Sequence, residues 1–262
     1  MFYINIDPYF HIGPLDIPWT AIGFVLAMSI TIILGILEAK RRGITIRLNG
    51  AAALCIVFIA GAFIGGKLFY LLDNWNRVIS YPEQFVHLSG IVIYGVVIGA
   101  VTAIAIYLKA RGLSFWKHGD AVAPGAMLGM SLYRVGCILS GCCYGLPSTS
   151  TCSVRYVNPD SFAPTNIAIY PTQVYHLVLG LLAFVILWIL RNRLKPEGAL
   201  FLLWLALFSA GDLAVRFFRV ANPFIFNWQL AQMVDIAILA VTLPWFIVKI
   251  QSHRANQKYL LE

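Results

Sequence analysis

Long apolar segments alternate with short polar segments along this chain of 262 residues. A helix needs roughly 20 apolar residues to cross the hydrocarbon core of a bilayer. Seven segments have about that length: residues 17–37, 50–72, 89–109, 120–141, 172–191, 198–217 and 229–249. Polar and helix-breaking residues separate them, as in the Lys-Arg-Arg-Gly run at 40–43. The pattern predicts an all-α integral membrane protein with seven transmembrane helices, forming a single polytopic membrane domain over 1–262.

The composition agrees with this interpretation. Hydrophobic residues make up 60% of the chain and charged residues 11%, whereas a soluble domain has about 25% charged residues. The net charge of +8 does not indicate a nucleic-acid partner, because the basic residues cluster in short runs between the apolar segments, as membrane topology requires.

The positions of lysine and arginine predict an orientation. Thirteen of the 19 basic residues lie in 38–48, 109–118, 191–197 and the C-terminal tail. Because cytoplasmic loops carry the excess of Lys and Arg, we expect the N-terminus outside and the C-terminus in the cytoplasm. The connection 142–171, rich in Ser, Thr, Pro and Asn, would then form a small extracytoplasmic cap.

Seven polar side chains interrupt the predicted spans: Lys67, Arg134, Gln173, His176, Asp212, Arg216 and Asp235. Asp212 and Arg216 are four residues apart on a helix, so they can pair and simply neutralise each other. Asp235 has no partner nearby in sequence, and Arg134 or Lys67 are its candidate partners across the bundle. Lys67 could otherwise extend its side chain to the outer interface.

Gln173 and His176 are three residues apart and are expected to share a helix face. A histidine titrates near neutrality, so His176 could transfer a proton. The alternative is an ordinary hydrogen-bonding histidine near a helix end.

Fixed positive charge in the outer half of the bundle suggests an anionic ligand. Arg134 is costly near hydrocarbon unless it has a partner or a function, and arginine is suited to bidentate phosphate contacts. Lys67, Arg216 and Arg219 could assist it, and a lipid headgroup is the phosphate available at that depth. Four glycines allow either close approach of a ligand or close helix packing: Gly95, Gly136, Gly141 and Gly145.

Three cysteines follow Arg134 with the spacing C-x4-C-C: Cys137, Cys142 and Cys143. Disulfide formation with Cys152 is one interpretation, since the outer face is oxidising in many bacteria, and simple packing is another. A catalytic thiol is a third. A metal site is the least favoured interpretation, because zinc and iron–sulfur sites usually contain C-x2-C pairs.

Several motifs, in their order along the chain, resemble those of the prolipoprotein diacylglyceryl transferase family of bacterial inner-membrane enzymes. They lie at 10–19, 65–70, 94–99, 120–124, 134–145, 170–175 and 216–219. The resemblance implies a multi-pass protein of the bacterial plasma membrane. It also implies transfer of the diacylglyceryl group of phosphatidylglycerol to the lipobox cysteine of a preprolipoprotein, at its signal peptide, with no cofactor.

The chain departs from the family pattern at several positions. Tyr94 stands where the family usually has a histidine, and a tyrosine with a pKa near 10 is a poor base at neutral pH. Asp212 and Arg216 stand where the family has an arginine and an acidic residue, so the charge pair looks exchanged. Cysteines and a serine replace polar side chains after Arg134.

Arg134 is therefore the predicted phosphate-binding residue, assisted by Lys67 and Arg216. His176 and Tyr94 are the other candidates at the reacting centre, with Gln173 nearby. An alternative hypothesis is a non-enzymatic membrane protein that binds or moves a lipid or another anion. A third is a thiol-redox role for the cysteines, which lack the C-x2-C motif.

Overall fold

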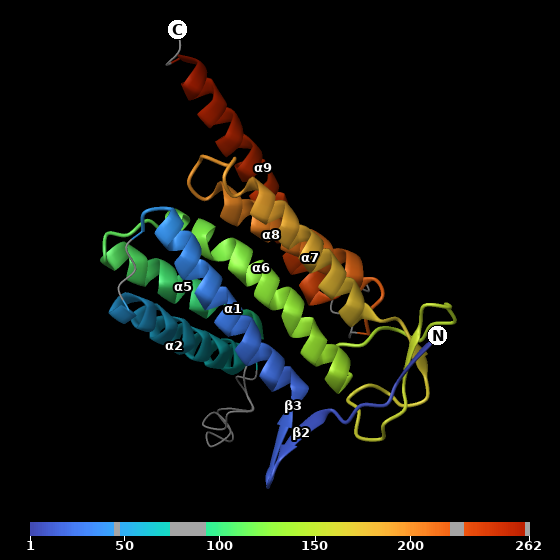
Figure 1. Cartoon of the computed structure of the whole chain (residues 1–262). Helices are drawn as coiled ribbons and strands as arrows, with labels where there is room; N and C mark the ends of the chain where they lie inside the picture. The colour runs from blue at the N-terminus through green and yellow to red at the C-terminus, as the bar shows by residue number, and fades with distance from the viewer. Residues whose placement is uncertain (45–47, 74–92, 221–227, 260–262) are drawn as a thin grey trace. The chain divides into compact units, whose positions relative to one another are not determined.

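Seven helices are present in the computed structural model, which describes residues 1–44, 48–73, 93–220 and 228–259 (Figure 1). They are α1 (Trp19–Arg41), α2 (Leu48–Asp73), α5 (Ile93–Ala110), α6 (Phe115–Ser140), α7 (Thr172–Leu190), α8 (Ala199–Arg216) and α9 (Leu230–Tyr259). Six of them are long and apolar enough to cross a membrane, and the apolar part of α5, Gly95–Ala110, is shorter. The predicted helical membrane fold is confirmed, while its orientation stays a prediction.

The chain forms two compact units. The smaller, Gly43–His118, contains α2 and α5, and the larger contains Met1–Arg42 together with Gly119–Glu262. In the smaller unit, glycines let the two helix backbones touch. A methyl group added to Gly65 would lie 2.2 Å from the carbonyl oxygen of Gly95, and one added to Gly99 would lie 2.2 Å from that of Gly61. Small residues that allow such close approach commonly join membrane helices.

Two buried carboxylates organise one end of the larger unit. Asp120 on α6 accepts hydrogen bonds from the backbone N–H groups of Gly198 (2.8 Å) and Phe201 (2.9 Å). It therefore satisfies donors at the start of α8, which lack partners within the helix. Glu38 at the end of α1 pairs with Arg41 on its own helix and with Arg191 at the end of α7.

Short strands, which the hydrophobic pattern did not predict, lie at the other end. Strand β1 (Phe2–Ile4) pairs in parallel with β4 (Val154–Tyr156), which pairs antiparallel with β5 (Ala168–Ile169). The connection 142–171 is thus an ordered cap, and the N-terminal segment is part of its sheet. Strands β2 (Tyr9–Ile12) and β3 (Leu15–Pro18) form a separate hairpin that leads into α1 (Figure 1).

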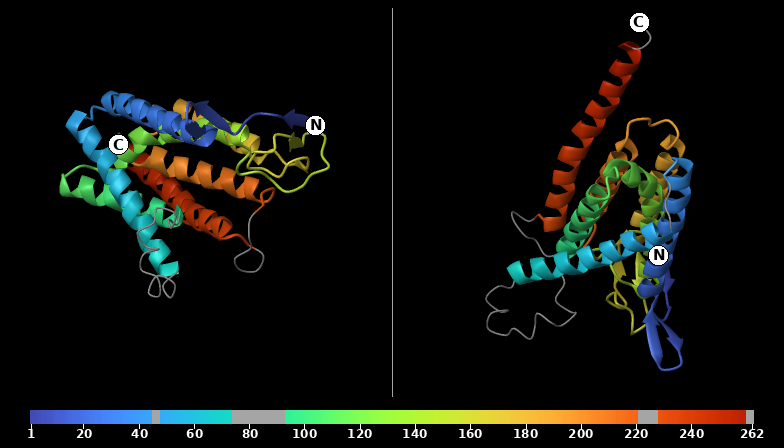
Figure 2. Two further views of the ribbon diagram at one scale, coloured as in Figure 1. Left: turned by 90° about the horizontal axis from the view of Figure 1, so that it is seen from below. Right: turned by 90° about the vertical axis from the view of Figure 1, so that its left-hand side faces the viewer.

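The first part of helix α9 packs against α8. The C-terminal turns of α9 extend beyond the other helices of the larger unit (Figures 1 and 2). The ends of α6 and α8 and the starts of α7 and α9 meet beside the cap. Six of the seven polar side chains predicted from sequence lie here: Arg134, Gln173, His176, Asp212, Arg216 and Asp235.

Candidate functional site

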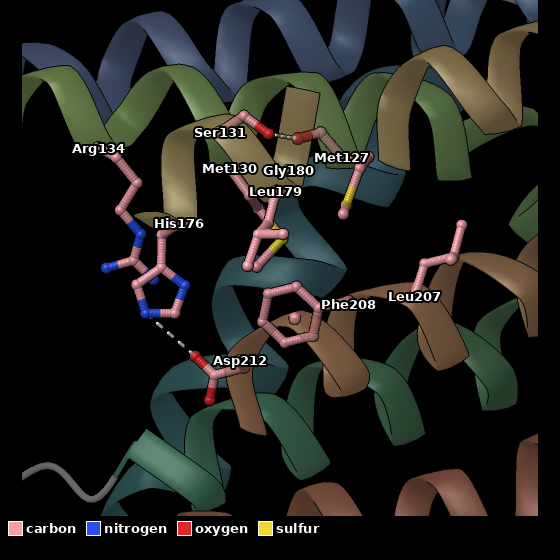
Figure 3. A pocket seen from close by; sticks show the side chains of 11 residues that line it. Met127, Met130, Ser131, Arg134, His176, Leu179, Gly180, Leu207, Phe208 and Asp212 are labelled. Atoms are coloured by element: carbon pink, nitrogen blue, oxygen red, sulfur yellow. Dashed lines mark hydrogen bonds and ion pairs between the residues drawn. The ribbon is translucent and has the colours of Figure 1, made fainter. Parts of the chain in front are cut away.

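A pocket lies between α6, α7 and α8, at the end of the bundle next to the cap (Figure 3). It encloses about 370 Å³, including the part that opens to the outside. Most of its wall is apolar, and three ionisable side chains reach it: Arg134, His176 and Asp212. The remaining lining residues are Met127, Met130, Ser131, Leu179, Gly180, Leu207, Phe208 and Gly211.

His176 and Asp212 face each other across this pocket. The imidazole Nε2 of His176 lies 3.5 Å from Oδ1 of Asp212, and both side chains are buried. Nε2 makes no hydrogen bond to any described residue. A buried imidazole nitrogen without such a bond, beside a carboxylate, can accept a proton and have the resulting charge offset.

Arg216 holds the carboxylate of Asp212 in place. Its Nε donates to Oδ2 of Asp212 at 2.5 Å and lies 3.3 Å from Oδ2 of Asp235 on α9. The predicted pairing of Asp212 with Arg216 is therefore confirmed. Asp235 pairs with Arg216, a partner that the prediction did not include, and Arg134 is not paired with Asp235 in the described part of the chain.

Arg134 has a different environment. Its guanidinium lies 5.9 Å from the ring centre of Tyr133, and no carboxylate of the described residues lies within ion-pair distance of it. Arg219, just after α8, is likewise without a carboxylate partner in the described part of the chain. The charges of both arginines act on His176. The pocket thus has positive charge that an anion could neutralise.

The three cysteines after Arg134 gather at the end of α6. Their sulfur atoms lie within 4.8 Å of one another. Hydrogen bonds from the Cys137 and Cys142 thiols, helped by the charges of Arg219 and Arg134, lower the pKa of Cys143. Hydrogen bonds with its two neighbours raise the pKa of Cys142. All five cysteines are free thiols, so the disulfide considered between this group and Cys152 is not present.

Comparison with known proteins supplies the family. A family model described as prolipoprotein diacylglyceryl transferase matches residues 8–248. This chain belongs to the prolipoprotein diacylglyceryl transferase family. A phosphatidylglycerol–prolipoprotein diacylglyceryl transferase of Dehalococcoides mccartyi is 34% identical over 259 residues, which cover 98% of this chain and 99% of the relative.

Proteins with the same name from other bacteria are similar along most of the chain. The one from Symbiobacterium thermophilum is 30% identical over 92% of this chain and 93% of its own length. The one from Nostoc sp. is 28% identical over 91% and 88%. The family predicted from the motifs is confirmed, and this family member is a multi-pass membrane transferase.

The pocket contains only part of the site predicted for this family member. Arg134, His176 and Asp212 all line it. Arg216 lies behind Asp212, and its Nε contacts the carboxylates of Asp212 and Asp235. Its charge therefore stabilises these two carboxylates, and its predicted contact with phosphate stays a prediction.

Three predicted residues belong to the smaller unit, Gly43–His118: Lys67, Tyr94 and Gly95. Lys67 is only 6% exposed, with its Nζ 5.9 Å from the ring centre of Tyr70. Its predicted role in binding phosphate stays a prediction. The side chain of Tyr94 lies outside the described residues. Gly95 packs against Gly65, where a methyl group would lie 2.3 Å from the carbonyl oxygen, so the packing alternative is the one observed.

The other predicted glycines also lie at close contacts with neighbouring segments of the chain. A methyl group on Gly136 would lie 2.6 Å from the carbonyl oxygen of Trp19, and one on Gly145 would lie 2.6 Å from that of Tyr170. Gly141 has a φ of +78°, which a glycine adopts at low cost. Gln173 donates to the carbonyl oxygen of Cys142 at 2.8 Å. Gly136 thus lets α6 approach the start of α1, while Gly141, Gly145 and Gln173 hold the connection between α6 and α7. Their predicted contacts with substrate stay a prediction.

Sequence reasoning missed Ser131 and Gly180 as residues of the pocket wall. Ser131 is three residues before Arg134, and Gly180 is four after His176, so helical periodicity places each on the same face as its charged neighbour. A methyl group on Gly180 would lie 2.2 Å from Oγ of Ser131. The spacing was the available signal, and these small residues bring α6 and α7 close together beneath the charged groups.

Proposed function

We propose that this protein transfers the diacylglyceryl group of phosphatidylglycerol to the lipobox cysteine of a preprolipoprotein in the bacterial plasma membrane. The named relatives support the reaction, since they match nearly the whole chain. The observation that carries the assignment to this pocket is Arg134, a guanidinium without a carboxylate partner among the described residues, beside the buried pair of His176 and Asp212.

Arg134 is proposed to bind the phosphate of the lipid. In the reaction, the acceptor sulfur forms a bond to the terminal glyceryl carbon, and the bond from that carbon to the phosphate oxygen breaks. The electrons of that bond leave with glycerol phosphate. Arg134 would offset the charge that develops on this leaving group, a form of stabilisation that is strong where water is scarce.

His176 is proposed to accept the proton of the acceptor thiol, because the thiolate is the nucleophile. The imidazolium formed in this step lies 3.5 Å from Asp212, which Arg216 holds in position. Arg134 lines the same pocket as His176, so the phosphate bound by Arg134 and the thiol facing His176 would be held close together.

Reconstituted protein provides the test. The purified chain is placed in vesicles with phosphatidylglycerol labelled in its acyl chains and incubated with a lipobox peptide from a signal sequence. Label on the peptide cysteine is expected, with none on a peptide in which that cysteine is alanine. Lipid that binds without transfer would support the non-enzymatic alternative and overturn the proposal.

A further inference from the structure

The sulfur atoms of Cys137, Cys142 and Cys143 converge on one point at the end of α6, outside the residues that line the pocket. They lie within 4.8 Å of one another. A zinc–sulfur bond is about 2.3 Å long, so three sulfurs around one ion lie roughly 4 Å apart. The observed spacing is therefore close to that of a three-thiolate metal site.

We propose that Cys137, Cys142 and Cys143 bind one thiophilic divalent metal ion of the zinc type. The binding releases three protons, one from each thiol, and leaves a metal–trithiolate group with a single negative charge. No His, Asp or Glu of the described residues completes the group. The fourth position would be left to water or another small ligand.

The backbone presents the thiols in this arrangement. Gly141 and Cys143 both have positive φ angles, +78° and +58°, and a non-glycine residue in this region is uncommon. These two residues turn the chain back, so that Cys142 and Cys143, five and six positions after Cys137, direct their sulfur atoms to the same place. Backbone strain of this kind is often kept at functional sites.

Hydrogen bonds from α7 hold the turn. The hydroxyl of Thr172 donates to the carbonyl oxygen of Cys143 at 2.8 Å, and Gln173 donates to that of Cys142 at 2.8 Å. Thr172 and Gln173 are buried. A metal ion bound here would fix the end of α6 to the start of α7, next to the segments that carry Arg134 and His176.

Charge also favours a trithiolate group. The guanidinium groups of Arg134 and Arg219 act electrostatically on the sulfur of Cys143. They would repel a free divalent cation, but the group formed after the loss of three protons is an anion, which they stabilise. A single disulfide would use only two of the three thiols and requires an oxidant.

Cadmium binding tests the proposal on the full chain in detergent micelles or nanodiscs, after treatment with a phosphine reductant and a chelator. One equivalent of Cd²⁺ should produce the ultraviolet charge-transfer band of cadmium thiolates. Cys143→Ser should weaken binding by about 100-fold or more, because even residues that only orient a ligand contribute 10–100-fold. Cys55→Ser and Cys152→Ser are matched controls and should bind as the wild type does.

X-ray absorption of the zinc-loaded wild-type protein requires no variant. It therefore tests the three-sulfur site even if Cys143→Ser does not fold. The expected result is three sulfur neighbours at about 2.3 Å. Three findings would each overturn the proposal: absence of a stoichiometric thiolate band, a band that survives in the Cys142→Ser, Cys143→Ser double variant, or a disulfide within the group in protein purified under reducing conditions.

Discussion

Replacing Arg134 by glutamine separates function from folding more cleanly than any other change in the pocket. Arg134 has no carboxylate partner among the described residues, so its removal leaves no buried anion uncompensated. Stability should therefore change little, by about 1 kcal/mol or less, because the substitution breaks no buried ion pair of the described residues. An activity loss in this variant can be assigned to the missing contact with the lipid phosphate.

The expected loss is large. Removing one donor that stabilises a developing oxyanion lowers kcat by about 10²–10³-fold, or roughly 2.7–4 kcal/mol. We expect Arg134→Gln to lower kcat/KM for diacylglyceryl transfer by that factor, and Arg134→Lys to retain part of the activity because it keeps the charge but loses the bidentate geometry.

Label transfer to a lipobox peptide measures the rate, and thermal unfolding in the same detergent measures stability. Arg155→Gln on the cap strand β4, outside the pocket, is the matched control and should behave as the wild type does. If Arg134→Gln retains more than a third of the wild-type rate while folding normally, Arg134 does not bind the reacting phosphate.

Three further predictions concern the neighbouring groups. His176→Ala should abolish transfer while Tyr94→Phe keeps most of it, both measured with the same peptide assay; the opposite pattern would show that Tyr94 has the family histidine's role. Arg216→Gln should destabilise the fold by about 3–5 kcal/mol, seen in denaturant unfolding, because it leaves two buried carboxylates without their counter-ion; unchanged stability would contradict this. At the exposed β2–β3 hairpin, hydrogen bonds that His11 donates to the carboxylates of Asp7 and Asp16 raise the pKa of His11, and His11 lowers the pKa of Asp7. Hydrogen-exchange protection of the hairpin should therefore be greatest between about pH 4 and 6.5. Protection should fall above about pH 6.5 as His11 loses its proton, and below about pH 4 as Asp7 gains one. In His11→Gln, the fall at the high-pH end should disappear.

The helices could be predicted from sequence because each is encoded locally, by an apolar run of sufficient length. The strands could not. Strand β1 has three residues and pairs with β4, about 150 positions later, so no local pattern marks it. For this reason the N-terminal segment was not recognised as part of the cap sheet.

The site was predictable where spacing on one helix determined it. The pair of Asp212 and Arg216 follows from a four-residue interval, and the structure contains it. The partner of Asp235 depends on how α8 and α9 pack, which no interval reveals. Arg216 contacts a second carboxylate, that of Asp235, on another helix. The spacing of residues along the chain could not reveal this contact, so the sequence showed only one of the two partners of Arg216.

The cysteines show the same limit. Their C-x4-C-C spacing resembles no common metal motif, so sequence gave no reason to expect three sulfurs at one point. The convergence depends on two residues with positive φ and on hydrogen bonds from the start of α7. Both features belong to the folded connection between α6 and α7. Of these, the sequence indicates only the turn at Gly141, because glycine readily adopts a positive φ.

The mass of a lipobox peptide incubated with the reconstituted protein and phosphatidylglycerol tests the central claim most directly. The proposed function predicts a gain equal to one diacylglyceryl group on the cysteine, together with release of glycerol phosphate. A peptide of unchanged mass, with correctly folded wild-type protein that binds the lipid, would contradict it.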